Sequence, residues 1–178
     1  MSPAPNVLLG RNDWLYFMGE DGRSIDRNYR GMFPISDAEI AAVVTELRRR
    51  QRFLTSLGIA YVVTIVPEKY TIYPEHLPVW VAKGDAPPPL ERLMVAISAD
   101  GNVRFVDLRA PLAAAKVRER VYYTTDSHWN MLGAAVGYNA MAIPLIPLLS
   151  ENFSRIVYVS ARRLDPGADS ARETGHCH

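Results

Sequence analysis

Apolar residues recur at helical spacing between Ser36 and Gly58. They occupy one face of the expected helix, at Ile40, Val43, Val44, Leu47, Leu54 and Leu57. Ser36 and Glu39 fit a capping box at the start of this run, and Gly58 is placed to stop it. The pattern predicts an amphipathic helix. The opposite face carries Arg48, Arg49, Arg50 and Arg52, which we interpret as a solvated helix face rather than an anion site.

A continuous β-branched run from Ala60 to Val66, closed by Pro67, predicts a strand buried on both faces of a parallel sheet. Helices and strands then alternate. We expect helices over 90–98, over 110–120 and from Asn130 onward, and extended segments over 103–108, 121–125 and 156–160. Two short apolar runs, 6–9 and 14–17, flank a turn-rich tetrapeptide and predict an N-terminal β-hairpin. This order favours an α/β fold with an open, mostly parallel sheet flanked by helices.

The most apolar window, Leu132 to Leu149, is about as long as a membrane span. It contains Asn139, Pro144 and Pro147, so we interpret it as a buried helix broken near Pro144. After residue 161 the chain is polar. We therefore expect one domain over 1–161 and a disordered tail over 162–178.

Composition excludes several classes of protein. The chain has 178 residues and a formal net charge of +1. This charge is too small to attract a polyanion over a long range, so we expect no nucleic acid as a partner. The single cysteine, Cys177, cannot form an internal disulfide. No export signal is visible in Met1 to Asn6, which suggests either a cytoplasmic chain or a missing leader. Asp126, His128 and the His176-Cys177-His178 end fit no zinc spacing, so we expect neither a metal nor a cofactor.

The segment Tyr123 to Asn130 holds the residue types that best suit catalysis. Asp126 and His128 are two positions apart, so at the end of an extended strand they point to the same side. A carboxylate that accepts from an imidazole N–H fixes the tautomer and stabilises the imidazolium. The structural alternative is equally open at this point: Asp126 would cap the following helix, beside a hydrogen-bonded histidine.

A second candidate segment, Val66 to Pro78, follows the predicted buried strand. Loops at this end of a strand line the ligand edge of an α/β sheet, so Lys69 and Tyr70 are candidate substrate contacts. We expect Tyr73 and His76 to pack in a loop braced by prolines. Trp129 is a further candidate for substrate contact, although core packing is the more common role of a tryptophan.

Three stretches taken together resemble the alginate O-acetyltransferase family of the AlgX/AlgJ type, within the SGNH-hydrolase-like proteins. They are Gly10 to Phe17, the Val66 to Pro78 loop, and Thr125 to Asn130. The resemblance covers about residues 6–160. It implies an SGNH-type sheet, incomplete at the C-terminus, and a periplasmic or membrane-tethered acetyltransferase. The implied partners are a polysaccharide substrate such as alginate, an acetyl donor protein or small acyl donor, and a membrane-associated secretion complex.

By the same resemblance, Asp126 would orient His128, and His128 would be the general base that activates a serine. The family places that serine well downstream, whereas only 50 residues follow His128 here. None of Ser150, Ser154, Ser160 and Ser170 lies in a matching turn. We therefore expect the nucleophile to lie outside this chain, and the isolated chain to be inactive. The alternative hypothesis is a non-catalytic module that binds polysaccharide through Trp80 and Trp129.

Overall fold

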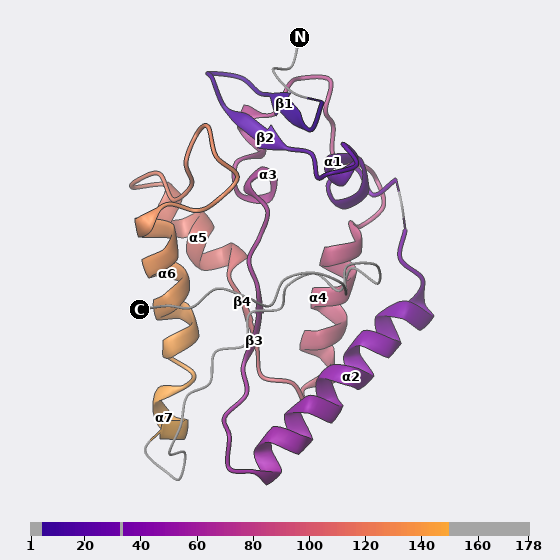
Figure 1. Cartoon of the computed structure of the whole chain (residues 1–178), viewed down its shortest axis with the longest axis vertical. Coiled ribbons are helices and arrows are strands. Elements are labelled where there is room, and N and C mark those ends of the chain that lie inside the picture. Colours follow the sequence, from indigo (N-terminus) through magenta and orange to yellow (C-terminus); the bar gives the residue numbers. More distant parts are fainter. Residues whose placement is uncertain (1–4, 33, 150–178) are drawn as a thin grey trace, which may run out of the picture.

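A computed structural model describes residues 5–32 and 34–149 of the chain. Helices and strands alternate through most of it (Figure 1). In chain order the elements are β1 (Val7–Leu9), β2 (Leu15–Phe17), α1 (Ser24–Asn28), α2 (Asp37–Ser56), β3 (Val63–Ile65), α3 (Lys69–Ile72), η1 (Pro74–His76), α4 (Pro89–Asp100), β4 (Phe105–Asp107), α5 (Arg109–Lys116), α6 (Met131–Ala142) and α7 (Ile146–Leu149). The predicted α/β class and the N-terminal hairpin are confirmed.

Strands β3 and β4 form the parallel centre of the molecule. Val63 pairs with Phe105 and Ile65 with Asp107, and the Thr64 hydroxyl donates to the Val106 carbonyl at 2.8 Å. Helices α2 and α4 lie on one side of this pair, and α5 and α6 on the other (Figure 1). Strand β3 is shorter than the predicted 60–66 run and only half-buried, because β4 is its single described neighbour.

Helix α2 forms as the sequence predicts. The Ser36 hydroxyl accepts from the Glu39 backbone N–H, and the Glu39 carboxylate accepts from the Ser36 backbone N–H. Ile40 and Val44 pack with Ile97 of α4 and with Val103. The four arginines on the other face are exposed; Arg49 and Arg50, for example, pair with Glu46. The solvated-face interpretation therefore agrees with the structure.

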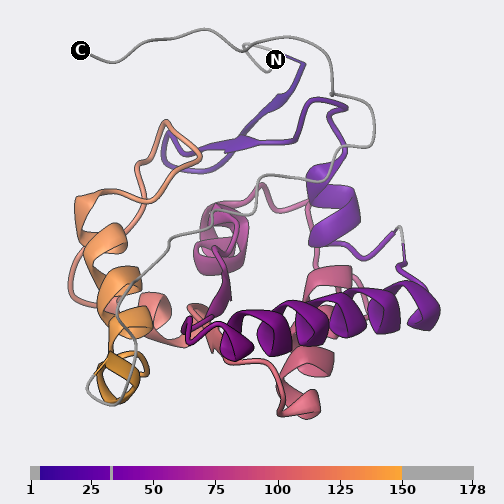
Figure 2. The same cartoon turned by 60° about the horizontal axis from the view of Figure 1, so that its bottom comes forward.

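The hairpin β1–β2 and helix α3 lie together above the central strands (Figures 1 and 2). Their rings form an aromatic core: Trp14 lies 4.5 Å from Tyr73 and 4.3 Å from the His76 ring, centroid to centroid. The fully buried Tyr16 hydroxyl donates to the Tyr73 carbonyl at 2.6 Å. Segment 66–78 is thus held as a short helix and a 3-10 turn, rather than as the loop expected from its prolines.

The second half differs from the prediction at three points. Helix α5 ends at Lys116 and not at the predicted residue 120. Residues 121–125 form no strand; only Tyr122 makes a ladder contact, an isolated antiparallel bridge to Trp129. Beyond it α6 begins at Met131 and ends before Pro144, as expected. It is not the buried helix that the apolar window predicted, because Gly133 and Gly137 are its only buried residues and Tyr138 is exposed. No helix in the described part of the chain is long and apolar enough to span a membrane. The predicted strand 156–160 and the predicted polar tail 162–178 lie outside the described residues.

Candidate active site

Asp126 and His128 lie in a tight loop, residues 122–129, which we call the Asp126 loop. The Tyr122–Trp129 bridge closes its base. Inside the loop the Tyr123 N–H donates to the His128 carbonyl at 3.2 Å, and outside it the Asn130 N–H donates to the Val121 carbonyl at 3.0 Å. The expected juxtaposition of the two side chains thus arises from a loop, and not from the pleat of a strand.

One carboxylate oxygen of Asp126 accepts twice from His128. Its Oδ1 lies 2.8 Å from the His128 backbone nitrogen and 2.5 Å from the ring Nδ1. The two side chains are 55% and 78% exposed, so solvent and substrate can reach them. Within the described residues, nothing is hydrogen-bonded to Nε2. The carboxylate therefore fixes the ring through Nδ1 and leaves Nε2 available for a proton.

These two hydrogen bonds also set the charge of Asp126. The His128 backbone N–H, followed by the His128 side chain, lowers the pKa of the Asp126 carboxyl below its ordinary value of 3.8. Both contacts favour the ionised form. At neutral pH the group facing His128 is therefore a carboxylate, which can stabilise an imidazolium.

The helix after the loop is capped by a different residue. The Asn130 side-chain oxygen accepts from the Gly133 N–H at 2.9 Å, so Asn130 is the N-cap of α6. The structural alternative, in which Asp126 caps this helix, is therefore wrong. Sequence could have suggested Asn130, because it directly precedes the apolar helical run and asparagine is a favoured cap.

Lys69 reaches the Asp126 loop from the first turn of α3. Its Nζ donates to the carbonyls of Tyr123, Thr124 and Asp126 at 2.9, 2.9 and 2.7 Å. Only 2% of the residue is exposed. Burial lowers the pKa of Lys69 to about 8, and the negative charge of Asp126 opposes this shift. The lysine thus faces the backbone of the loop rather than solvent.

A cavity of about 380 Å³ opens beside His128. The loop contributes Ser127, His128 and Trp129 to its wall, and the segment after β3 contributes Val66, Pro67 and Glu68. Phe17, Gly19 and Ser24 from the hairpin side complete the lining. Ser24 donates to the Phe17 carbonyl at 3.2 Å, and neither Ser24 nor Ser127 is hydrogen-bonded to His128. The described lining therefore presents a histidine to which no serine hydroxyl of the lining is hydrogen-bonded.

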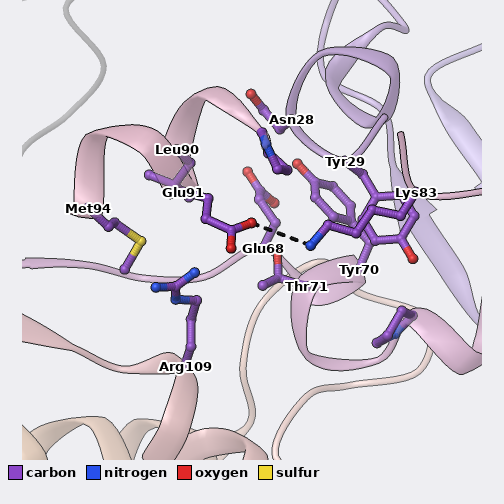
Figure 3. A pocket seen from close by; sticks show the side chains of 12 residues that line it. Asn28, Tyr29, Glu68, Tyr70, Thr71, Lys83, Leu90, Glu91, Met94 and Arg109 are labelled. Atoms are coloured by element: carbon purple, nitrogen blue, oxygen red, sulfur yellow. Dashed lines mark hydrogen bonds and ion pairs between the residues drawn. The ribbon is translucent and has the colours of Figure 1, made fainter. Parts of the chain in front are cut away.

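A second cavity, of about 200 Å³, also borders the segment after β3, which contributes Glu68, Tyr70 and Thr71 to its lining (Figure 3). Glu68 lines both cavities. Tyr29, Tyr70 and Arg109 lie on the walls of the second cavity, and Lys83 pairs with Glu91 across its opening at 3.4 Å (Figure 3). No histidine of the described residues lines it, so the first cavity, whose wall includes His128, is the candidate active site.

The aromatic candidates occupy different environments. Tyr70 is 2% exposed, and its ring makes an edge contact with Tyr29 at 5.9 Å. Trp129 is half-buried, packs on the core, and lines the His128 cavity. Trp80 is 65% exposed and lies outside both cavities. Of the residues predicted to contact substrate, Trp129 alone joins His128 in one cavity wall.

The described residues hold no group of three or more His, Cys, Asp and Glu side chains that could bind a metal ion. The tail histidines and Cys177 considered for such a site lie outside these residues.

Comparison with known proteins places the chain in a family. Residues 7–152 match the family model described as the SGNH hydrolase-like domain of the acetyltransferase AlgX. The chain belongs to this family. Its AlgX-type domain includes the hairpin, the β3–β4 pair and the Asp126 loop described above.

Curated relatives of this AlgX-type domain share the same segment. The chain is 32% identical over 137 residues to the probable alginate O-acetylase AlgJ of Pseudomonas syringae pv. tomato, covering 74% of the chain and 31% of that protein. It is 31% identical over 147 residues to the AlgJ of Pseudomonas fluorescens, covering 78% and 33%. The chain thus spans about a third of the length of these relatives.

Solved structures support the AlgX-type fold. The O-acetyltransferase domain of Pseudomonas putida AlgJ superposes with a TM-score of 0.54 and 28% identity, covering 80% of the chain and 48% of that domain. Bacillus cereus PatB1 superposes with a TM-score of 0.58 and 16% identity, covering 85% and 46%. The PatB1 match shows the SGNH-like fold alone, and the AlgJ match agrees with the family assignment.

The sequence analysis does not single out several residues that line the His128 cavity. It includes Glu68 only as part of a loop, yet Glu68 lines both cavities. Phe17 and Ser24 come from the hairpin side, more than 100 positions before His128. Their position depends on how the hairpin docks, which no local spacing encodes. The proximity of Glu68 could have been inferred, because it follows a central strand.

Proposed function

We propose that this chain carries the general-base half of a serine-dependent O-acetyltransferase that acts on hydroxyl groups of an exopolysaccharide such as alginate. The single observation that carries the proposal is the 2.5 Å contact between Asp126 and the Nδ1 of His128, a residue that lines an open cavity. Family membership and the names of the AlgJ relatives support the acetyl group and the substrate class.

The chemistry assigns a task to each group. A serine hydroxyl, supplied by polypeptide outside these 178 residues, gives its proton to His128 Nε2 and attacks the acetyl carbonyl of the donor. The donor's leaving group takes that proton, and an acetyl-serine remains. Nε2 next accepts the proton of a sugar hydroxyl, which attacks the acetyl-serine, and returns that proton to the departing serine oxygen, so that an acetylated sugar, a free serine hydroxyl and neutral His128 remain. Asp126 stabilises the imidazolium in both halves.

The setting of this reaction is part of the same proposal. The donor is an acetyl-carrying protein or a small acyl ester, and the acceptor is a polysaccharide in the periplasm, beside the secretion machinery. The exposure of His128 suits a polymeric acceptor, because a chain of sugars can reach a base that is 78% exposed. Transfer exceeds hydrolysis only where bound acceptor excludes water from the acetyl-serine.

The test uses the full-length protein that the gene encodes, with a chromogenic acetyl ester as donor and alginate oligosaccharide as acceptor. We expect His128→Gln and Asp126→Asn each to lower kcat for transfer by about 100-fold or more. Thr125→Ala is the matched control, because Thr125 is an exposed neighbour that takes no part in the Asp126–His128 contacts. Full transfer activity in both site variants would refute the proposal.

A second experiment locates the nucleophile. The 178-residue chain alone is expected to release no acetate from the ester. If it does release acetate, and alanine variants of Ser24, Ser127, Ser150, Ser154, Ser160 and Ser170 all stay active, no serine triad operates. Alginate binding that survives Asp126→Ala and His128→Ala, in a full-length protein without transfer activity, would instead favour a polysaccharide-binding module.

A further inference from the structure

The ammonium of Lys69 is fully occupied by the Asp126 loop. A lysine ammonium has three protons to donate, and three carbonyls, those of Tyr123, Thr124 and Asp126, lie within 2.9 Å of this one. All three belong to one six-residue stretch that ends at His128. No other described side chain hydrogen-bonds to more than one carbonyl of this stretch.

The surroundings of this ammonium are apolar on the other side. Nζ lies 5.3 Å from the ring centroid of Trp14 and 5.2 Å from that of Tyr16, and both rings are buried. A buried charge costs stability unless it is hydrogen-bonded, and the aromatic faces compensate only in part. The buried ammonium of Lys69 is therefore compensated mainly by its hydrogen bonds to the backbone carbonyls of the Asp126 loop.

Few other contacts hold the tip of the loop. The Leu15 N–H of β2 donates to the Thr124 carbonyl at 2.9 Å, so that carbonyl accepts from both Leu15 and Lys69. The Asp126 carbonyl, one residue from the centre of the Asp-x-His motif, accepts from Lys69 at 2.7 Å. Fixing this carbonyl restricts the backbone on the C-terminal side of Asp126, and with it the direction of the carboxylate.

We propose that Lys69 is a positioning residue that holds the Asp126–His128 pair in register through three backbone carbonyls. It touches neither substrate nor the reacting atoms. This inference rests on the proposed function for its catalytic consequence, while its structural consequence can be measured without any acetyl transfer.

The first test compares Lys69→Met with Lys116→Met. Methionine keeps the length of the buried stem and removes the ammonium. Lys116 is the matched control: its Nζ also donates to a backbone carbonyl, that of Ile72, and lies 4.8 Å from the Tyr73 ring, but it makes no contact with the Asp126 loop. In full-length protein, we expect Lys69→Met to lower kcat about tenfold or more with KM within about twofold, and Lys116→Met to leave both within about twofold.

The second test follows the Asp126 carboxyl by NMR in the 178-residue chain. The positive charge of Lys69 contributes to the lowered pKa of Asp126, so Lys69→Met is expected to raise that pKa, and Lys116→Met is not. This measurement needs no substrate. A raised Asp126 pKa with unchanged kcat would refute the catalytic part of the inference; an unchanged pKa and an unchanged kcat would refute all of it.

A third measurement needs no substitution, in case Lys69→Met does not fold. Burial lowers the pKa of Lys69 to about 8. The charged and titratable groups around it titrate elsewhere, because the pKa of Asp126 is lowered and burial raises the pKa of Tyr16. We therefore expect the amide signals of residues 123–128 to shift together, with a midpoint near pH 8. If the Lys69 Cε and Hε signals titrate and the amide signals of residues 123–128 do not move with them, the positioning role is overturned.

If the proposed function fails but the inference holds, Lys69→Met still raises the pKa of Asp126, while the unsubstituted protein and all variants lack acetyl transfer. If the inference alone fails, His128→Gln abolishes transfer and Lys69→Met does not.

Discussion

The indole of Trp129 lies against Gly137, two turns into the helix that follows the Asp126 loop. A Cβ at position 137 would stand 2.7 Å and 3.0 Å from two carbons of the Trp129 ring. Since Trp129 also closes the base of the loop by pairing with Tyr122, this contact positions one wall of the His128 cavity.

Gly137→Ala is therefore expected to destabilise the fold by about 1–3 kcal/mol, because a rigid ring must shift to admit the methyl group. Chemical denaturation measures the change. In a Trp129→Leu background the clash is gone, and the same substitution should become neutral or stabilising, since alanine exceeds glycine in helix propensity by about 1 kcal/mol. An equal cost in both backgrounds would contradict this explanation.

The Tyr73 hydroxyl is hydrogen-bonded to the backbone directly before the Asp126 loop. It accepts from the Val121 N–H at 2.9 Å in a fully buried position. Tyr73→Phe leaves that N–H without a partner, which is expected to cost about 1–3 kcal/mol of unfolding free energy. Tyr138→Phe is the matched control, because Tyr138 is 57% exposed, and should change the free energy of unfolding little. Equal effects of the two substitutions would show that the buried hydrogen bond contributes nothing.

The helices could be predicted from the sequence because the residues that start, pattern and end each helix lie within that helix or next to it. The capping box at Ser36, the helical spacing after it, and the proline at 144 each act within a few residues. Parallel pairing of β3 with β4 followed from the alternation of strands and helices. The Asp126 loop was less accessible: its shape depends on Lys69, 57 positions earlier, and its apolar, β-branched start resembles a strand.

The same distinction applies to the candidate site. The sequence singled out Asp126, His128 and Lys69, and the structure brings all three together. It could not predict that Lys69 turns inward, because burial of a lysine depends on which acceptors the fold supplies. Nor could it predict the hairpin wall of the cavity, since Ser24 and Phe17 reach it only through tertiary packing.

The capping box offers a test of stability away from the site. Ser36→Ala removes the acceptor of the Glu39 N–H and is expected to cost about 1 kcal/mol of unfolding free energy. Ser98→Ala serves as the control, because Ser98 is an exposed residue inside helix α4. Neither substitution should alter acetyl transfer at saturating substrate. Loss of transfer in Ser36→Ala without loss of stability would contradict the separation of this cap from the site.

The pH dependence of Asp126 separates the two contributions of His128. The lowered pKa means that ionised Asp126 stabilises the fold at pH values above its ordinary 3.8, and that this contribution is lost as pH falls through the folded value. His128→Ala removes the ring but keeps the backbone N–H, which is the larger cause of the shift. The pKa of Asp126 should therefore rise only part of the way to its ordinary value.

Carboxyl NMR titration measures the pKa of Asp126 in His128→Ala. Asp21 is the internal control, because its lowered pKa depends on Arg23 and Arg27 instead. If the Asp126 pKa does not move in His128→Ala, the ring and carboxylate are not paired in solution, and the proposed mechanism loses the contact by which Asp126 stabilises the imidazolium.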